Sequence, residues 1–268
     1  MNKEILKDYN FKKKFGQNFL YDENILRNIV EKSEIDKDTL VLEIGVGAAY
    51  LTYYVSEKAK NVIGYEIDES LKDIINDQLK DRDNVEIVYG DFLEQNVKSK
   101  LKEYDYKKLY VVANLPYYIT TPIITKIIND KLGVDKIVIM VQKEVGDRFT
   151  EPNSKEYNAL NIFLNYYFDI KKLMDVSRNC FTPKPNVDSV IVEFKSNKKY
   201  DVKNEELFFK LVRDSFKFKR KNLKNNLKGY DLEKIDNILN KIGKDLTIRA
   251  EALTIEDFVL ISNSLWYN

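Results

Sequence analysis

The stretch TLVLEIGVGAA, residues 39–49, predicts the fold of this chain. Its first half is almost entirely apolar, which is typical of a strand covered on both faces. Gly45 and Gly47 follow directly, and glycines at this place let the backbone turn tightly and approach a ligand closely before a helix begins. A buried strand, a glycine turn and a helix together indicate a parallel α/β sheet with a ligand site at its carboxyl edge.

The same pattern recurs along the chain on the carboxyl side of this stretch. Further short apolar runs occupy residues 61–67, 84–90, 109–115 and 136–142, and stretches with helical periodicity separate them. One of these stretches begins near Pro122, and proline favours the first turn of a helix. Strands that alternate with helices predict an α/β fold with a doubly wound, Rossmann-like sheet.

The pattern changes near residue 196, where the apolar strand runs stop. Apolar residues spaced three and four apart then predict helices over 205–218, 232–242 and 255–264. We therefore expect a catalytic α/β domain over 1–196 and a small C-terminal α-helical domain over 197–268, with the polar stretch SNKKYDVKN at the boundary.

Composition excludes several classes of protein. The chain has 268 residues, 44% hydrophobic and 32% charged, which indicates a folded chain whose apolar runs are too short to span a membrane. The start of the chain has no apolar core of signal-peptide length, and Cys180 is the only cysteine, so we expect a cytoplasmic protein. Histidine is absent, which excludes the usual zinc sites and the triads that use an imidazole, and no metal is expected.

Basic side chains concentrate in two segments although the formal net charge is only +1. The segment 216–228 contains no acid, and we predict that its residues Lys217, Lys219, Arg220, Lys221 and Lys224 bind RNA. Lysines also occupy positions 12–14. Two interpretations stay open, because such clusters are either solvated faces of a lysine-rich protein or phosphate-binding patches on one RNA surface.

Acidic residues follow the next two predicted strands. Glu66 ends the second run, where a carboxylate can bind the two hydroxyls of a ribose, and Asp91 follows the third, where it can accept from an adenine amino group. We predict that their neighbours Ile67 and Phe92 also contact the cofactor. Taken singly, each feature could be a surface residue or a turn, but three strand-end features in register favour a nucleoside pocket.

The glycine turn lacks the features of a phosphate site. Ala49 stands near the place of the third glycine that a dinucleotide turn uses, and no Lys followed by Ser or Thr marks a P-loop. S-adenosylmethionine contains adenosine but no phosphate. The pattern therefore favours this cofactor, which becomes S-adenosylhomocysteine, over NAD or ATP.

The tetrapeptide Asn114-Leu115-Pro116-Tyr117 follows the fourth predicted strand. The amino group of adenine is a weak nucleophile because its lone pair is delocalised into the ring. The Asn114 side-chain oxygen and the Leu115 backbone carbonyl can accept its hydrogens and so favour a pyramidal nitrogen. Pro116 fixes the backbone, and Tyr117 offers a ring on which the base can stack. Without the cofactor signals upstream, a strand-ending turn would be the simpler interpretation.

Phe181 precedes the proline-stiffened loop TPKP and a strand-like run. Its ring could stack on the base from the face opposite Tyr117, although packing in the core is the ordinary role of such a residue. A target base must leave its stack to reach this pocket, at a cost of a few kcal/mol, which favours unpaired bases of RNA loops.

Several motifs resemble, in order, those of the ribosomal RNA adenine N6,N6-dimethyltransferases. They are FGQNFL (15–20), LEIGVG (42–47), Glu66, Gly90-Asp91, Asn114 to Tyr117, QKEV (142–145) and FTPKPNVD (181–188). The resemblance implies that Asn18, Leu20, Gly45, Glu66, Asp91 and Asn114 contact S-adenosylmethionine, and that residues 114–117 and Phe181 hold the target adenine. Ala49 departs from the family, which usually carries another glycine there, so a backbone with positive φ at this position would put the cofactor affinity in doubt.

The resemblance points to one of two branches. QKEVGDRF (142–149) and KRKNL (219–223) resemble the KsgA type, which dimethylates two adjacent adenosines in the 3′-terminal hairpin of 16S rRNA in the immature small ribosomal subunit. We expect this activity, in a monomer that binds no membrane. The alternatives are an erythromycin-resistance enzyme that modifies 23S rRNA, an assembly factor with weak catalysis, and a nucleotide-dependent oxidoreductase.

Overall fold

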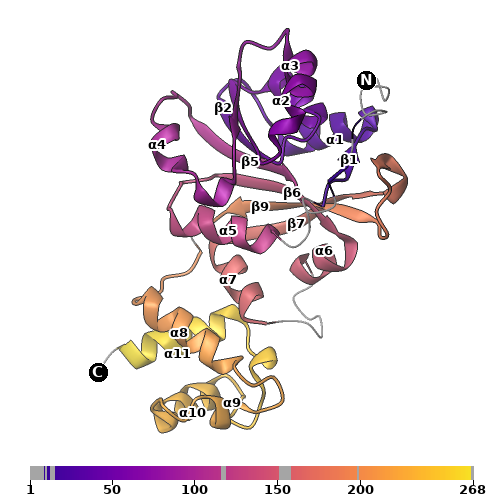
Figure 1. Cartoon of the computed structure of the whole chain (residues 1–268). Coiled ribbons are helices and arrows are strands. Elements are labelled where there is room, and N and C mark those ends of the chain that lie inside the picture. Colours follow the sequence, from indigo (N-terminus) through magenta and orange to yellow (C-terminus); the bar gives the residue numbers. More distant parts are fainter. Residues whose placement is uncertain are drawn as a thin grey trace. The chain divides into compact units, whose positions relative to one another are not determined.

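The computed structural model describes residues 9, 11–12, 16–115, 119–150, 158–197 and 199–266, and within them a seven-stranded sheet (Figure 1). Its strands, in spatial order, are β4 (Val85–Tyr89), β3 (Asn61–Glu66), β2 (Thr39–Ile44), β5 (Lys108–Asn114), β6 (Lys136–Gln142), β9 (Ser189–Ser196) and β7 (Phe168–Val176). Each predicted strand run forms a strand within a residue or two of its expected bounds.

The direction of the strands explains where a ligand can bind. β2 pairs in parallel with both β3 and β5, while β3 continues to β4 and β5 continues to β6, also in parallel. β9 returns antiparallel to β6. The strand order therefore reverses between β2 and β5, and in doubly wound sheets ligands bind beyond the carboxyl ends of the strands at this point.

Helices cover both faces of the sheet (Figure 1). They are α1 (Glu23–Ser33), α2 (Tyr50–Lys58) and α3 (Lys72–Leu79) on one face, α4 (Val97–Leu101) and α5 (Thr120–Asn129) on the other, and α6 (Lys143–Thr150) after β6. Short 3₁₀ turns occupy Glu69–Leu71, Phe92–Glu94 and Arg178–Cys180, and β1 (Phe19–Leu20) pairs antiparallel with β8 (Phe181–Thr182).

Burial follows the position of each strand in the sheet. Every residue of the central strand β2 is buried, which explains its nearly continuous apolar sequence. The edge strand β4 is only half-buried along its length. The core of this part of the chain therefore lies around β2, directly beneath the glycine turn that follows it.

The chain divides into two units. The first comprises Met1–Thr150 and Ile170–Lys195, and the second comprises Glu151–Asp169 and Ser196–Asn268. The second unit therefore includes residues 151–169, which the sequence analysis assigned to the α/β domain. The reason is that helix α7 (Ala159–Tyr167) buries Ile162 and Tyr166 in a core with residues beyond 200.

The second unit is helical. Besides α7 it contains α8 (Glu205–Ser215), α9 (Leu223–Asn226), α10 (Leu232–Lys241), a 3₁₀ turn at Ala250–Ala252 and α11 (Ile255–Trp266). Helix α8 ends at Ser215, three residues before its predicted end, because the chain turns there and Lys221 N–H donates to the Phe218 carbonyl at 2.9 Å. None of the helices in the described residues is long and apolar enough to cross a membrane.

Candidate functional site

A pocket opens at the carboxyl ends of the parallel strands, where the strand order reverses. The predicted residues that line it are Asn18, Leu20, Gly45, Gly47, Glu66, Ile67, Asp91, Phe92, Asn114, Leu115 and Phe181. Pro116 and Tyr117, which the sequence analysis also assigned to the reaction site, lie outside the described residues. The structure thus brings together side chains from widely separated parts of the sequence.

The glycine turn after β2 needs backbone angles that side chains rarely adopt. Gly45 has φ +77° and Gly47 has φ +60°. A Cβ on Gly47 would lie 2.9 Å from ring carbons of Phe19, and a Cβ on Gly45 would lie 3.5 Å from the backbone oxygen of Asn114. The turn is therefore packed between Phe19 on one side and the end of β5 on the other.

Ala49 also adopts a left-handed backbone, with φ +59° and ψ +22°, and its side chain is fully buried. An L-residue in this conformation costs roughly 1–2 kcal/mol relative to a relaxed backbone. The loop therefore needs positive φ at the position where the sequence departs from the family.

The Glu66 side chain is hydrogen-bonded to the glycine turn. Its carboxylate accepts the Gly47 N–H at 2.7 Å and the Asp68 N–H at 2.8 Å, and the side chain is 5% exposed. Burial raises the pKa of this carboxyl, although the two backbone N–H groups favour the ionised form. Each carboxylate oxygen can accept more than one hydrogen bond, so Glu66 can still accept hydrogen bonds from the ribose hydroxyls of a ligand, as predicted.

The end of β4 lies beside Glu66. Gly90 N–H donates to the Glu66 backbone carbonyl at 2.8 Å, and one oxygen of Asp91 accepts the Leu93 N–H at 2.9 Å. Ile67 is 45% exposed although it lines the pocket. An exposed apolar side chain next to carboxylates suits the face and edge of a purine ring.

Asn114, the last residue of β5, faces the N-terminal segment. Its side-chain nitrogen donates to the backbone oxygen of Asn18 at 3.4 Å, and Leu115 beside it is buried. Because the amide nitrogen is turned toward Asn18, the amide oxygen is the end that can accept a hydrogen bond from a ligand.

Phe181 lies deeper than the sequence suggested. Its side chain is only 4% exposed and packs in the core of the first unit, while its backbone pairs with Leu20. It nevertheless contributes to the pocket wall. The structure therefore shows the core-packing role, and stacking on the target base stays a prediction.

Glu43 was not predicted from the sequence as a site residue. This residue lies within β2, lines the pocket and is 1% exposed, and among the described residues its Oε2 has no hydrogen-bond partner. Burial raises the pKa of the Glu43 carboxyl to about 8, with a further contribution from the nearby charge of Glu66. The available signal was an acid inside an otherwise apolar strand.

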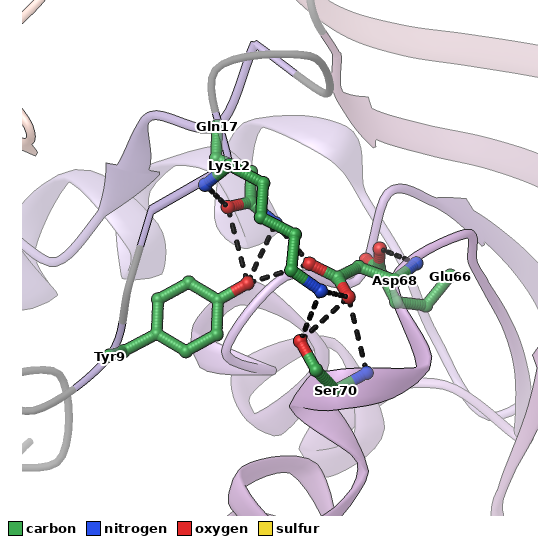
Figure 2. A network of polar contacts seen from close by, with 6 residues as sticks. All are labelled: Tyr9, Lys12, Gln17, Glu66, Asp68 and Ser70. Atoms are coloured by element: carbon green, nitrogen blue, oxygen red, sulfur yellow. Dashed lines mark hydrogen bonds and ion pairs between the residues drawn. The ribbon is translucent and has the colours of Figure 1, made fainter.

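Asp68, at the centre of the polar network in Figure 2, was also not predicted from the sequence. Its buried carboxylate accepts from Tyr9 Oη at 2.7 Å, Lys12 Nζ at 2.6 Å and Gln17 Nε2 at 2.8 Å. It also accepts from the hydroxyl and N–H of Ser70. Burial alone would raise the pKa of Asp68, but these hydrogen bonds outweigh it and hold the pKa well below its usual range.

The two basic segments differ in the structure. Lys12 is committed to its ion pair with Asp68, and Lys13 and Lys14 lie outside the described residues. In the second unit, the five predicted RNA-binding side chains at 217, 219, 220, 221 and 224 are all exposed. None of the acids in the described residues forms an ion pair with them.

The charge of the pocket distinguishes between possible ligands. Glu66 and Asp91 line it, together with Glu43, whose raised pKa of about 8 keeps its carboxyl protonated and uncharged near neutral pH. No lysine or arginine lines the pocket among the described residues. Such a site repels the phosphates of NAD or ATP and attracts a ligand that carries positive charge. S-adenosylmethionine carries positive sulfonium and ammonium groups, which match the acidic residues of this pocket.

Comparisons with known proteins agree with this geometry. The chain is 42% identical to a ribosomal RNA small subunit methyltransferase A from Oceanobacillus iheyensis, over 98% of this chain and 94% of the relative. It is 45% identical to the enzyme of the same name from Bacillus pumilus, with the same coverage. The family described as ribosomal RNA adenine dimethylase matches residues 8–266.

Solved structures show the same fold. The 23S rRNA methyltransferase ErmE superposes with a TM-score of 0.76 at 23% identity, covering 92% of this chain and 99% of that one. A dimethyladenosine transferase from Plasmodium falciparum superposes with a TM-score of 0.74 at 25% identity, covering 91% and 95%. The family match and the full-length relatives together show that this chain belongs to the ribosomal RNA adenine dimethylases.

Proposed function

We propose that this chain transfers methyl groups from S-adenosylmethionine to the N6 amino groups of two adjacent adenosines in the 3′-terminal hairpin of 16S rRNA. The substrate is the immature small ribosomal subunit, and the enzyme acts on it as a monomer in the cytoplasm. The observation that carries the proposal is the position of Asn114, whose backbone oxygen lies against the glycine turn of an acidic, nucleoside-sized pocket.

The first part of the proposal concerns the cofactor. When bound, S-adenosylmethionine supplies a methyl group on a positively charged sulfur. Glu66 would hold the ribose and Asp91 the adenine amino group, while Asn18, Leu20, Gly45 and Gly47 enclose the rest, together with Ile67 and Phe92. The acids on the wall favour the cation over a neutral product, which helps S-adenosylhomocysteine to leave.

The second part concerns the target adenine. Asn114 Oδ1 and the Leu115 carbonyl would accept the two amino hydrogens and so localise the nitrogen lone pair toward the methyl group. Tyr117 and Phe181 would flank the base, and Pro116 would fix the turn. No strong base is needed, because the nitrogen becomes acidic once it is methylated and its proton can pass to water. The rate enhancement then comes from alignment and preorganised acceptors.

The third part concerns RNA. The exposed side chains Lys217, Lys219, Arg220, Lys221 and Lys224 of the helical unit would contact phosphates and place the hairpin. Such contacts contribute affinity but little sequence information, so the choice of base rests with the pocket.

The test is a map of methylated adenines in rRNA from cells with and without this chain, followed by methyl transfer to purified small subunits. We expect two adjacent N6,N6-dimethyladenosines near the 3′ end of 16S rRNA that disappear with the gene and return with the protein. Modification of 23S rRNA instead would identify the erythromycin-resistance activity. Subunit binding without any methyl incorporation would identify an assembly factor.

A further inference from the structure

The N-terminal segment is fastened to the cofactor pocket through Asp68. Tyr9, Lys12 and Gln17 all donate to this carboxylate (Figure 2). Gln17 continues directly into residues 18–20, which form part of the pocket wall. The side chain of Asp68 is 2% exposed, so water competes poorly with these donors.

A chain of hydrogen bonds continues from Asp68 to the glycine turn. The Asp68 N–H donates to one oxygen of Glu66, and the other oxygen of Glu66 accepts the Gly47 N–H. The same region is closed from the other side, because Phe19 packs against Gly47 and the Asn18 carbonyl accepts from Asn114. Hydrogen bonds and packing contacts thus connect residues 17–20 with Glu66 and with the glycine turn.

We propose that Asp68 is a positioning residue that holds Gln17, and with it the pocket-lining residues 18–20, against the cofactor pocket and keeps Glu66 and Gly47 in their binding geometry. Asp68 is not among the residues that line the pocket, so we expect its loss to weaken cofactor binding and to leave the methyl-transfer step nearly unchanged. This inference rests on the proposed use of the pocket for S-adenosylmethionine.

The test compares Asp68→Asn with Asp36→Asn. Asp36 is a matched control because its carboxylate also holds a lysine, a hydroxyl and a backbone N–H, from Lys108, Thr39 and Asp38, but at the opposite end of β2. Calorimetry with S-adenosylmethionine gives Kd, and steady-state kinetics give KM and kcat. For Asp68→Asn we expect Kd and KM to rise about tenfold or more while kcat changes less than about threefold. Asp36→Asn should change none of the three.

A second readout does not depend on methyl transfer. Trypsin cuts after the lysines at 12–14, and S-adenosylmethionine should slow this cleavage in the wild type. Asp68→Asn should be cleaved faster with or without cofactor. If Asp68→Asn does not fold, Tyr9→Phe and Lys12→Gln weaken the same contacts from the other side, and Lys12→Arg should restore KM.

The outcomes separate this inference from the proposed function. Failure of the wild type to bind S-adenosylmethionine overturns the function, whereas the cleavage rates still report the role of Asp68. Unchanged Kd and cleavage in Asp68→Asn, or an equal loss of affinity in Asp36→Asn, overturns the positioning role.

A different observation points to a second site, in the helical unit. Phe218 is 48% exposed in the turn that follows α8, and the ammonium groups of Lys217 and Lys221 lie 5.7 and 4.5 Å from its ring centroid. The Asn226 side chain stabilises this turn, because its amide nitrogen donates to the backbone carbonyls of Ser215 and Phe218. An aromatic ring is therefore held out to solvent among cations.

We infer that Phe218 stacks on an unpaired base of the RNA substrate while the neighbouring lysines contact its phosphates. Exposed aromatic rings interleaved with basic side chains are the usual platform for single-stranded nucleic acids. The cations favour a polyanion over an apolar protein partner. This inference extends the proposed RNA contact by a residue that carries no charge.

The test measures binding of the full chain to a short single-stranded RNA over a range of salt concentrations. Phe218→Ala should weaken binding about fivefold or more without changing the salt slope, and Phe218→Trp should retain it. Trp266→Ala is the matched control, since Trp266 is 51% exposed at the end of α11 and none of the lysines in the described residues lies over its ring.

An RNA with abasic sites distinguishes stacking from charge. The wild type and Phe218→Ala should bind it equally, because the phosphates remain and the bases are gone. Equal binding of the two proteins to intact RNA overturns the stacking role. The result does not depend on methyl transfer, so it stays separate from the proposed function.

Discussion

At the scale of single residues, Asn114 carries the proposed chemistry. Asn114→Ala removes an acceptor for the adenine amino group, and loss of one such preorganised group typically lowers kcat by a factor of about 10²–10³. The fold should be preserved, because among the described residues the Asn114 side chain makes a single long hydrogen bond, to the Asn18 carbonyl at 3.4 Å. Methyl incorporation and thermal unfolding measured together check both expectations.

The control for this variant is Asn129→Ala, at the exposed end of α5 and away from the pocket. It should leave both methyl transfer and thermal unfolding unchanged. Turnover of Asn114→Ala near the wild-type rate would refute the proposed role of the amide.

The raised pKa of the Glu43 carboxyl should make the free energy of unfolding depend on pH. Its carboxyl has a pKa of about 8 in the folded chain and an ordinary value of 4.5. Between these values the folded state holds a proton that the unfolded state has lost, so this group makes the free energy of unfolding fall as pH rises from about 4.5 to 8. Glu43→Gln removes the titration.

Urea unfolding across this pH range checks the expectation for Glu43. The stability of Glu43→Gln relative to the wild type should rise with pH and level off above about 8. A constant difference between the two proteins would show that the Glu43 carboxyl does not titrate in this range.

Ala49 tests the left-handed position in the glycine turn. Ala49→Gly relieves backbone strain but loses a buried methyl group and loosens the unfolded chain, so we expect the free energy of unfolding to change by less than about 1 kcal/mol. Ala49→Val places a branched side chain at positive φ in a fully buried site and should cost more than about 2 kcal/mol. Urea unfolding measures both, and equal losses would contradict this account.

At the scale of elements, the segment from α8 to α9 carries exposed cations. Neutralising Lys219, Arg220 and Lys221 to Gln should weaken RNA binding and flatten its dependence on salt, because fewer counterions are released. Filter binding to the small-subunit hairpin at several salt concentrations measures the slope.

A variant with the same change in net charge is the control. Lys58, Lys98 and Lys102 are exposed and belong to the α/β unit. Their replacement by Gln should alter the slope much less. If the two triple variants behave alike, overall charge rather than this segment determines RNA binding.

Helix α7 shows why an element can belong to a different unit from its neighbours in sequence. Its buried side chains Ile162 and Tyr166 pack in the helical core, and Tyr166 also donates to Glu205 of α8 at 2.7 Å. The apolar periodicity of α7 reports that one face is buried, but not against which partner. No helix over these residues was predicted from the sequence, and only the tertiary structure assigns α7 to the helical unit.

At the scale of the whole molecule, the two units have separate cores, and this separation can be tested. Ile162→Ala removes a fully buried side chain from the helical core and should destabilise that unit by about 2–5 kcal/mol. Cofactor affinity should be unchanged, because the described residues that line the pocket all belong to the first unit. RNA affinity should fall, because the exposed basic residues belong to the second.

Urea unfolding followed by the fluorescence of Trp266, the only tryptophan in the chain, measures the helical unit, and calorimetry with S-adenosylmethionine measures the other. A parallel loss of cofactor affinity in Ile162→Ala would show that the two units do not fold separately.

The sequence by itself determined the parallel sheet, the glycine turn and the place of Asn114, since a strand buried on both faces must be apolar and the ligand edge follows from strand direction. Only the tertiary structure decided that Tyr9, Lys12 and Gln17 meet Asp68, and that Glu43 lines the pocket. The physical reason is that periodicity records whether a side chain is buried, whereas a hydrogen bond between distant segments depends on how the whole chain closes around its core.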